Sequence, residues 1–465
     1  MTTTFLLVVF DGLRPDMVTL ANTPNLLRFA AMGTRFTRAR SVFPSETRVC
    51  TATVTTGCQP RRHGLIANRF AHPADPGRLI DTGDKSALQA MQRDLGQDLL
   101  DVPTLGDILA AAGRDFVVLS SGSTGQAHVL NPHAEANGQL TLSAHGPQAS
   151  SPLGAALFAE LAPPPTAPVA RGVWTAELFR TRFLPNPPAA TVLWLCEPDT
   201  SAHYQGLGAP AQLEALRAMD AAFGRILDDW QAGPQREHLQ IMVASDHGHT
   251  TITGHADVAA ALADLPAFAG CTLASGSSGS LWVPKGDRAQ IAALASWLTR
   301  QDWVGNVFAD DGPPSVLPRA AVQADHPRAG QIVFTLRATA APAPSGLPGS
   351  AIYDGGLKLG AGTHGGLSAT ELHTVLMLAG SQVVPDARAE WPAGLADIAP
   401  TALHLLGIAG PVMDGRVLGE ALRDAAVPAM APASESWEAA EDGYSQRLAR
   451  TRLGGQVYLE YGERG

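Results

Sequence analysis

Six residues combine metal-binding side chains with positions directly after apolar runs. They are three aspartates and three histidines: Asp11, Asp199, His203, Asp246, His247 and His364. Carboxylate and imidazole groups suit zinc and, less tightly, manganese. The D-x-x-x-H spacing of Asp199 and His203 places both side chains on one face of a helical turn. Asp246 and His247 are adjacent at a strand end, where neighbouring side chains diverge, so each could serve a different ion. Together the six residues predict a site for two metal ions.

Each residue also has a purely structural interpretation. An aspartate after a strand often caps the next helix, which would be the simplest role for Asp11 alone. His63 could bond the backbone of a turn, and His249 could support a ligand rather than bind metal. The metal interpretation is favoured because all six residues follow apolar runs.

A hydroxyl-rich segment, "FPSETRVCTATVTTG" (residues 43–57), is the candidate source of a nucleophile. It predicts a short helix ended by Gly57, with Ser45 or Thr47 at its start. Free backbone N–H groups at a helix start bind anions, although a hydroxyl there can also act only as a cap. A threonine hydroxyl is too weakly acidic to attack at neutral pH, but a coordinated metal ion would lower its pKa as it does that of water.

The elements that must position these residues alternate between strand and helix. "TFLLVVFDG", "ATVLWLCEPD" and "LQIMVASDHG" are apolar runs that end in Asp11, Asp199 and Asp246. They are typical of buried parallel strands. Residues 23–33 and 211–233 have helical patterns between strands. This alternation predicts an α/β sheet with its ligand site at the carboxyl ends of the strands.

The domain organisation follows from changes in this pattern. Residues 1–265 and 346–424 form the expected catalytic core, and residues 266–345, with strands around a helix near 288–300, form an expected α+β cap inserted into it. Within the insertion, "RATAAPAPSGLPGS" predicts a Pro/Gly-rich loop. Residues 425–465 are a C-terminal tail of unassigned role.

The composition of the chain limits the kinds of molecule that it is expected to bind. The chain has 465 residues and a formal net charge of −10, which disfavours a nucleic-acid surface because phosphate backbones reward clustered Lys and Arg. The four cysteines form no metal or disulfide pattern. No apolar run approaches the roughly 20 residues of a membrane helix, and the N-terminus lacks the charged region of a signal peptide. We therefore expect a cytoplasmic protein without a membrane span; the oligomeric state is not predicted.

An ordered set of motifs resembles the alkaline phosphatase superfamily, and within it the type I phosphodiesterase/nucleotide pyrophosphatase branch. The motifs are "VVFDGLRPD", "TPNLLRFAAMGTRF", "FPSETRVCTATVTTGCQPRRHGLIAN", "EPDTSAH", "SDHGH" and "GTHGG". The segment 397–418 resembles the closing helix of that superfamily. The resemblance implies a three-layer α/β/α core with a mostly parallel sheet and an inserted cap.

The resemblance also implies roles for individual residues. Asp11, Asp246 and His247 match the ligands of one zinc, and Asp199, His203 and His364 match those of the second, with manganese as a possible substitute. Thr47 matches the nucleophile that bridges the metals. Asn68 matches the asparagine that contacts a phosphoryl oxygen. The implied reaction is hydrolysis of a phosphodiester or pyrophosphate bond through a phosphothreonine.

The segment around Thr47 departs from this branch, which usually has a lysine before the threonine and an aromatic residue with Pro-Asn after it. Here Glu46 precedes and Arg48 follows. The aromatic residue often stacks a nucleobase, so preference for a nucleotide over another small phosphodiester or a phosphonate stays open. Arg48 is either a contact for a phosphate or phosphonate oxygen or a surface ion-pair residue.

Two alternative functions are open at this point. The same metals and threonine would serve a phosphonate (C–P) hydrolase of the phosphonoacetate hydrolase type. A non-catalytic, metal-stabilised binding protein is the alternative from another class. It is disfavoured because the six ligand positions, Thr47 and Asn68 are all intact.

Overall fold

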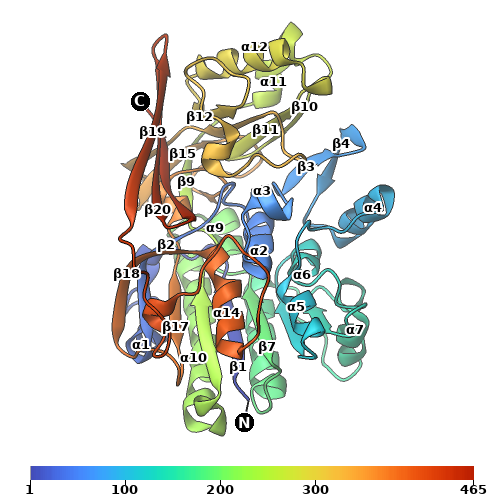
Figure 1. Cartoon of the computed structure of the whole chain (residues 1–465), viewed down its shortest axis with the longest axis vertical. Helices are drawn as coiled ribbons and strands as arrows, with labels where there is room; N and C mark the ends of the chain where they lie inside the picture. The colour runs from blue at the N-terminus through green and yellow to red at the C-terminus, as the bar shows by residue number, and fades with distance from the viewer. Residues whose placement is uncertain (1) are drawn as a thin grey trace.

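The chain folds around a central sheet whose first strand is buried on both faces. The computed structural model describes residues 2–465 (Figure 1). β1 (Thr4–Phe10) is apolar at nearly every position because its alternating side chains enter two different hydrophobic clusters. Leu6 and Val8 pack on one face of the sheet, and Leu7 and Val9 pack on the other. A continuous apolar run is therefore the pattern of this strand.

The central sheet has eight strands in the order β18-β2-β17-β8-β1-β7-β5-β6. β17 runs antiparallel to both of its neighbours, and the other pairings are parallel. The bounds of the strands besides β1 are β2 (Thr34–Arg40), β5 (Phe116–Ser120), β6 (Leu140–Ser143), β7 (Ala190–Leu195), β8 (Leu239–Ala244), β17 (Leu376–Ala379) and β18 (Ala387–Gly394).

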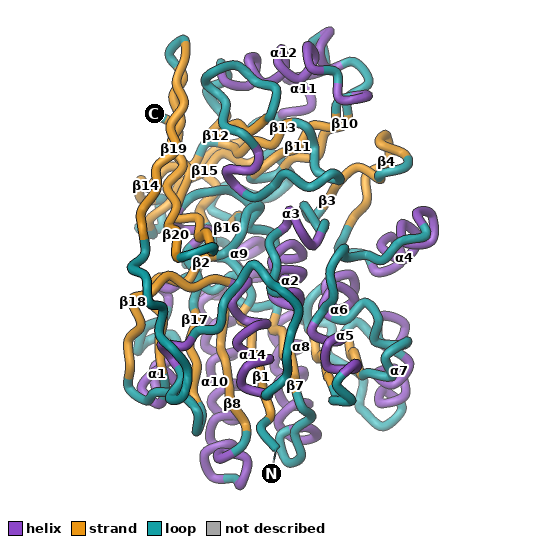
Figure 2. The backbone as a smooth tube through the Cα atoms, in the orientation of Figure 1, coloured by secondary structure: helices purple, strands orange, loops and turns teal. Residues whose placement is uncertain are grey.

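Helices cover both faces of this sheet and complete three layers (Figure 2). One face is covered by α2 (Thr47–Thr56), α5 (Leu105–Ala111), α6 (Thr124–Leu130) and α14 (Ile398–Leu406). The other is covered by α1 (Pro24–Met32), α8 (Pro168–Leu178), the short α9 (Asp199–Gln205) and the long α10 (Pro210–Ala232). Further helices are α3 (Pro60–His63), α4 (Lys85–Leu95), α7 (Pro152–Phe158) and α13 (Ala369–Leu372). The α/β class with a mainly parallel sheet is confirmed.

Smaller antiparallel sheets lie beyond the carboxyl ends of the central strands, at the upper end of the molecule in Figure 1. One of them has the order β10-β11-β13-β12, and α12 (Arg288–Thr299) shares its hydrophobic cluster with α11 (Val258–Leu262). Its strands are β10 (Thr272–Ser275), β11 (Ser278–Trp282), β12 (Val304–Ala309) and β13 (Ile332–Leu336). The hairpin of β3 (Arg69–His72) and β4 (Asp75–Asp81) contacts β10.

The Pro/Gly-rich segment after β13 is a hairpin rather than the predicted loop. β14 (Ala338–Pro342) pairs with β15 (Pro348–Tyr353), and β15 continues into a sheet with β9 (Thr250–His255) and β16 (Gly362–Thr363). β14 is an exposed edge strand. Proline is tolerated there because an edge position does not need every N–H group for pairing.

The C-terminal residues fold into a three-stranded sheet, which the sequence pattern did not predict. It consists of β19 (Ala433–Glu441), β20 (Tyr444–Leu453) and β21 (Gln456–Arg464). Leu448 and Leu459 share a buried cluster with Phe308 of β12. The side chain of Arg40 in β2 also forms an ion pair with Glu460 at 2.6 Å. These contacts attach the segment to both the central sheet and the β10–β13 sheet.

Candidate metal centre and active site

Three carboxylates lie at the carboxyl ends of three neighbouring strands. Asp11 directly follows β1, Asp246 follows β8, and Asp199 begins α9 after β7, with these strands in the order β8-β1-β7. Parallel strands end at the same edge of a sheet, so their loops converge. The N–H of Gly12 donates to Asp246 Oδ1 over 3.0 Å and links two of these loops directly. The strand-end prediction for all three acids therefore agrees with the structure.

Four histidine rings around these carboxylates share one hydrogen-bonding pattern. Nδ1 lies 2.7 Å from Gly362 O in His203, 3.0 Å from Gly248 O in His247, 2.9 Å from Gly12 O in His249 and 2.8 Å from Ser45 O in His364. Because a carbonyl oxygen can only accept, each Nδ1 carries the hydrogen. In the neutral ring, Nε2 then presents a lone pair. Metal-binding histidines are oriented in this way, with the second nitrogen held by a carbonyl.

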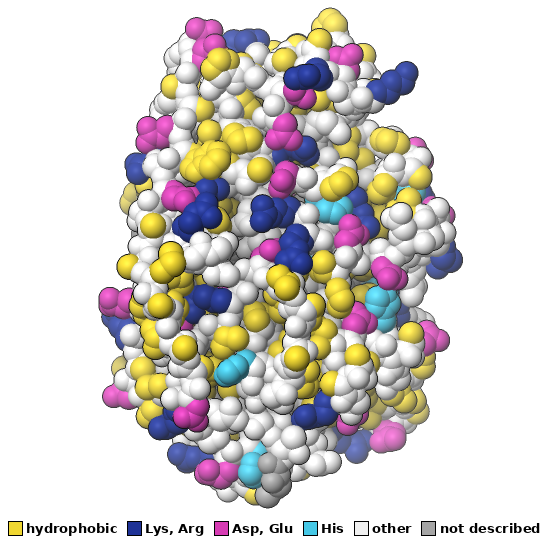
Figure 3. Space-filling model, viewed as in Figure 1, with side chains coloured by type: hydrophobic (Ala, Val, Ile, Leu, Met, Phe, Trp, Pro, Cys, Tyr) yellow, Lys and Arg dark blue, Asp and Glu magenta, His cyan; other side chains and the backbone are white. Residues whose placement is uncertain are grey.

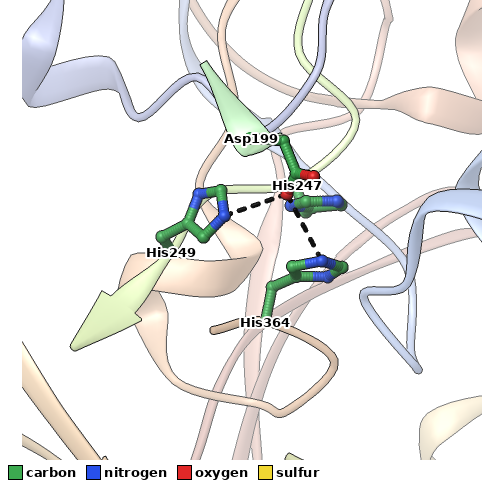
Figure 4. A group of neighbouring side chains, drawn as sticks. All are labelled: Asp199, His247, His249 and His364. Carbon is green, nitrogen blue, oxygen red and sulfur yellow. Dashed lines mark hydrogen bonds and ion pairs between the residues drawn. The ribbon is translucent and has the colours of Figure 1, made fainter. Parts of the chain in front are cut away.

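Around Asp199, these lone pairs face another acceptor. Asp199 Oδ1 lies 3.2 Å from Nε2 of His203, 3.0 Å from Nε2 of His249 and 3.5 Å from Nε2 of His364. Figure 4 shows His249 and His364 converging on this carboxylate. An ionised carboxylate and neutral Nε2 atoms are all acceptors, so their approach requires a cation or a proton between them.

The same arrangement occurs around Asp11 and Asp246. Nε2 of His247 lies 3.5 Å from Asp11 Oδ1 and 3.3 Å from Asp246 Oδ2. Within residues 2–465, neither of these buried carboxylate oxygens has a hydrogen-bond partner. Leaving such groups unpaired is costly, and a divalent ion would satisfy them. The donor set therefore fits one metal ion at this cluster and another at the Asp199 cluster.

The rings of His247 and His364 join the two clusters. They stack nearly in parallel, with centroids 3.6 Å apart and an interplanar angle of 11°. The ligand atoms of Asp199, His247, His249 and His364 lie within 4.8 Å of one another, as do those of Asp11, Asp246 and His247. Two His/Asp clusters that share a histidine are compatible with a binuclear metal site.

Burial controls the protonation of the Asp11 cluster when no metal is bound. Desolvation raises the pKa of Asp246 to about 8 and, together with repulsion from Asp246 and Asp199, raises the pKa of Asp11 well above its usual range. Desolvation lowers the pKa of His247 to about 3. These shifts favour the uncharged form of all three groups, the response expected where a compensating cation is missing.

We expect the metal-free protein to lose stability as the pH rises from about 6.5 to about 8. The folded state retains a proton on Asp246, whose pKa is about 8, whereas the unfolded chain releases it near its ordinary pKa of 3.8. The folded state then binds more protons, so the free energy of unfolding falls with pH. His247, with a pKa lowered from 6.5 to about 3, has the opposite effect, but only below this window. The loss from one group is at most about 2 kcal/mol.

Urea unfolding of chelator-treated protein at both pH values measures this effect. Asp246→Asn cannot titrate and should show a smaller loss than the wild type. Equal losses in the two proteins would contradict the assignment.

Thr47 is the first residue of α2 and faces the metal cluster. Its Oγ1 lies 3.2 Å from His247 Nε2, and the helix ends at Gly57 with φ of +66°. No side chain caps the start of this helix, because Ser45 instead donates to Gly366 O over 2.9 Å. The alternative that Ser45 or Thr47 serves as a side-chain cap is therefore wrong.

Asn68 and Arg48 lie beside Thr47. The side-chain oxygen of Asn68 accepts a 3.2 Å bond from the backbone N–H of Arg48. The Asn68 N–H donates to the carboxylate of Glu46, whose pKa is raised by burial. Glu46 therefore holds the asparagine-bearing loop against the start of α2.

These residues line a cavity of about 490 Å³ next to the metal cluster. Its lining includes Asn68, His203 and His364 and the Ser275–Ser280 segment between and along β10 and β11. Tyr204 and Tyr353 also line it. The size is typical of a small-molecule site. On the face of the molecule shown in Figure 3, Lys and Arg side chains are interspersed with Asp and Glu.

The sequence pattern indicated His249 only as a possible support for a ligand, whereas the structure places it in the Asp199 cluster. It is fully buried, and a Cβ atom on Gly12 would lie 2.3 Å from its Cε1 atom. Gly12 also has φ of +70°. Both the lack of space for a Cβ atom and this backbone conformation therefore favour glycine at the position. The bond from Nδ1 of His249 to a backbone carbonyl matches those of the three predicted histidines, and its place two residues after His247 was the available signal. His63, in contrast, bonds Leu65 N and Thr53 Oγ1 and lies outside the cluster.

An α/β fold with paired His/Asp clusters beside a threonine-bearing helix is compatible with the class of two-metal enzymes, which includes phosphatases and nucleases. The sequence profile of the Type I phosphodiesterase / nucleotide pyrophosphatase family matches residues 5–333. The chain belongs to this family of enzymes. A search of curated proteins gave no match.

Solved structures share the fold at low sequence identity. Human ectonucleotide pyrophosphatase/phosphodiesterase 5 has a TM-score of 0.64 at 16% identity, with 90% of this chain and 100% of that chain covered. An inactive murine ectonucleotide pyrophosphatase/phosphodiesterase 5, with a threonine replaced by alanine and AMP bound, has a TM-score of 0.63 at 17% identity, covering 89% of this chain and 97% of that one. Separately, within residues 2–465 no helix has the length and apolar content to cross a membrane.

Proposed function

We propose that this enzyme cleaves phosphodiester or pyrophosphate bonds with two zinc ions and a phosphothreonine intermediate. The observation that carries the proposal is the convergence of Nε2 lone pairs and carboxylate oxygens in two clusters, with the Thr47 hydroxyl 3.2 Å from the Nε2 of His247. The inactive threonine-to-alanine variant of the murine relative supports a catalytic threonine in this chain as well.

The residues divide between two ions. Asp11, Asp246 and His247 would hold one, and Asp199, His203 and His364 would hold the other, with the Thr47 hydroxyl beside His247. Thiolates take no part, and Asp/His ligands suit zinc best and manganese less tightly. When bound, the ions would lower the pKa of the Thr47 hydroxyl and of water and would balance charge on the phosphoryl oxygens.

The chain then supplies the nucleophile and the positioning. Thr47 Oγ1, having lost its proton to solvent, bonds to phosphorus as the bond to the leaving oxygen breaks. Water next bonds to phosphorus, the Thr47 oxygen leaves with its electron pair, and it regains a proton. Asn68, whose Oδ1 is held by the Arg48 N–H, directs its amide N–H₂ toward a phosphoryl oxygen. Fixed donors of this kind act by electrostatic stabilisation.

We propose that the substrate binds in the cavity of about 490 Å³. The β10–β13 sheet of the inserted segment 266–345 contributes its Ser275–Ser280 wall, so this cap would select the substrate while residues 1–265 and 346–424 perform the reaction. AMP in the murine relative supports a nucleotide as one substrate. Tyr204, which is 71% exposed at the cavity, is an available surface for a planar group.

The experiment that tests the proposal is hydrolysis of bis-(p-nitrophenyl) phosphate by the purified protein. We expect turnover that is lost on chelation and restored by zinc or manganese. Phosphonoacetate is measured in parallel, since cleavage of it alone would assign the C–P hydrolase function. Absence of hydrolysis of diesters, monoesters and phosphonates by zinc-loaded protein would refute the proposal in favour of a binding protein.

A further inference from the structure

Arg48 is half-buried and has no anionic partner among the described residues. Within residues 2–465, its guanidinium forms no ion pair, and its Nε is shielded from solvent without a hydrogen-bond partner. The fully buried arginines each bond a carboxylate: Arg14 with Asp16, Arg40 with Glu460, Arg328 with Asp101, and Arg450 with Glu435. A shielded guanidinium nitrogen in a side chain without an acidic partner requires explanation.

The position of Arg48 is fixed relative to the nucleophile. It follows Thr47 in the first turn of α2, and its backbone N–H donates to Asn68. Its side chain lines the cavity of about 490 Å³, and Nη2 lies 3.9 Å from the position of a Cβ on Gly83. The guanidinium thus extends away from the metal cluster along the cavity wall.

The acidic side chains near Arg48 accept hydrogen bonds from other groups. Glu46 accepts a bond from the Asn68 N–H. Asp81, on the same cavity wall, accepts a 2.8 Å bond from Gly83 N and forms no ion pair with Arg48 among the described residues. Arg48 lines the same cavity as Glu46 and His203. Its charge therefore acts within the cavity, where a substrate would meet it.

We propose that Arg48 binds a second phosphate next to the scissile one, so that the enzyme prefers pyrophosphate bonds to esters with an uncharged leaving group. This inference rests on the proposed function of the site. A guanidinium matches phosphate geometry through two parallel N–H donors. In the reaction, Thr47 oxygen bonds to the proximal phosphorus, the P–O bond to the distal phosphate breaks, and that phosphate leaves with the electron pair. Arg48 neutralises the charge that develops on it.

A matched pair of substrates tests this preference. Thymidine triphosphate and the p-nitrophenyl ester of thymidine monophosphate present the same phosphoryl group with different leaving groups. Arg48→Met should lower the ratio of their kcat/KM values, triphosphate over ester, about 10- to 100-fold, and Arg48→Lys should lower it less. Arg61→Met is the control, since Arg61 is exposed and lies outside the cavity; it should leave the ratio unchanged.

Binding measured by calorimetry in a Thr47→Ala background separates the two proposals. Arg48→Met should weaken thymidine triphosphate about tenfold more than thymidine monophosphate. If this occurs in a protein whose wild type hydrolyses neither substrate, the role of Arg48 stands and the proposed reaction fails. If the wild type hydrolyses the ester but Arg48→Met leaves the kcat/KM ratio unchanged, or lowers both substrates equally, the role of Arg48 is overturned and the proposed reaction stands.

Discussion

Thr47→Ala is expected to lower kcat by at least ~10⁴-fold while both metal ions remain bound. The substitution removes the hydroxyl and the γ-methyl group of Thr47, and the carboxylates and imidazoles of the clusters are untouched. Thr47 Oγ1 lies 3.2 Å from His247 Nε2. The fold should be preserved because the helix uses the backbone of Thr47, whose carbonyl accepts from Thr51 Oγ1 over 2.6 Å.

The measurement pairs turnover of the nitrophenyl diester with zinc content by elemental analysis. Thr55→Ala is a matched control on the same helix, since its hydroxyl bonds Leu130 O rather than the site. Thr47→Ser should recover part of the activity because it restores the hydroxyl. A Thr47→Ala protein with nearly native rates would show that water attacks directly and that no phosphothreonine forms.

Asp246→Ala and His364→Ala are each expected to lose about one equivalent of metal and to lower turnover by at least ~10³-fold. Asp246 Oδ2 is an unpaired, fully buried oxygen facing His247, so its removal takes away a ligand of the Asp11 cluster. His364 directs Nε2 to Asp199 Oδ1 while Nδ1 is held by Ser45 O. Its removal should empty the second cluster preferentially.

Zinc content after dialysis, and competition with a chromophoric chelator, would measure the loss independently of activity. His145→Ala is the control, because His145 is exposed and outside both clusters. If both ligand variants bound zinc as the wild type does, the ligand assignment would be wrong, whatever their catalytic rates.

The local sequence pattern was sufficient to predict the features that depend on residues adjacent in the chain. The run before Asp11 is apolar because β1 is buried on both faces. The pattern of that run therefore predicts a carboxylate at the carboxyl end of a buried strand, where the site lies. The same holds for Asp199, Asp246 and the helix from Thr47 to Gly57. Sequence alone thus determined the α/β class and most of the candidate ligands.

The remaining features of the fold and the site depend on contacts between segments that are distant in the chain. His249 belongs to the cluster because its ring meets Gly12, 237 residues earlier, and no local period encodes that contact. The C-terminal strands are recognisable only through partners such as Phe308 and Arg40. The residue type of Arg48 does not indicate whether its guanidinium has an acidic partner. Only tertiary packing places the Arg48 side chain on the cavity wall, without an ion pair among residues 2–465.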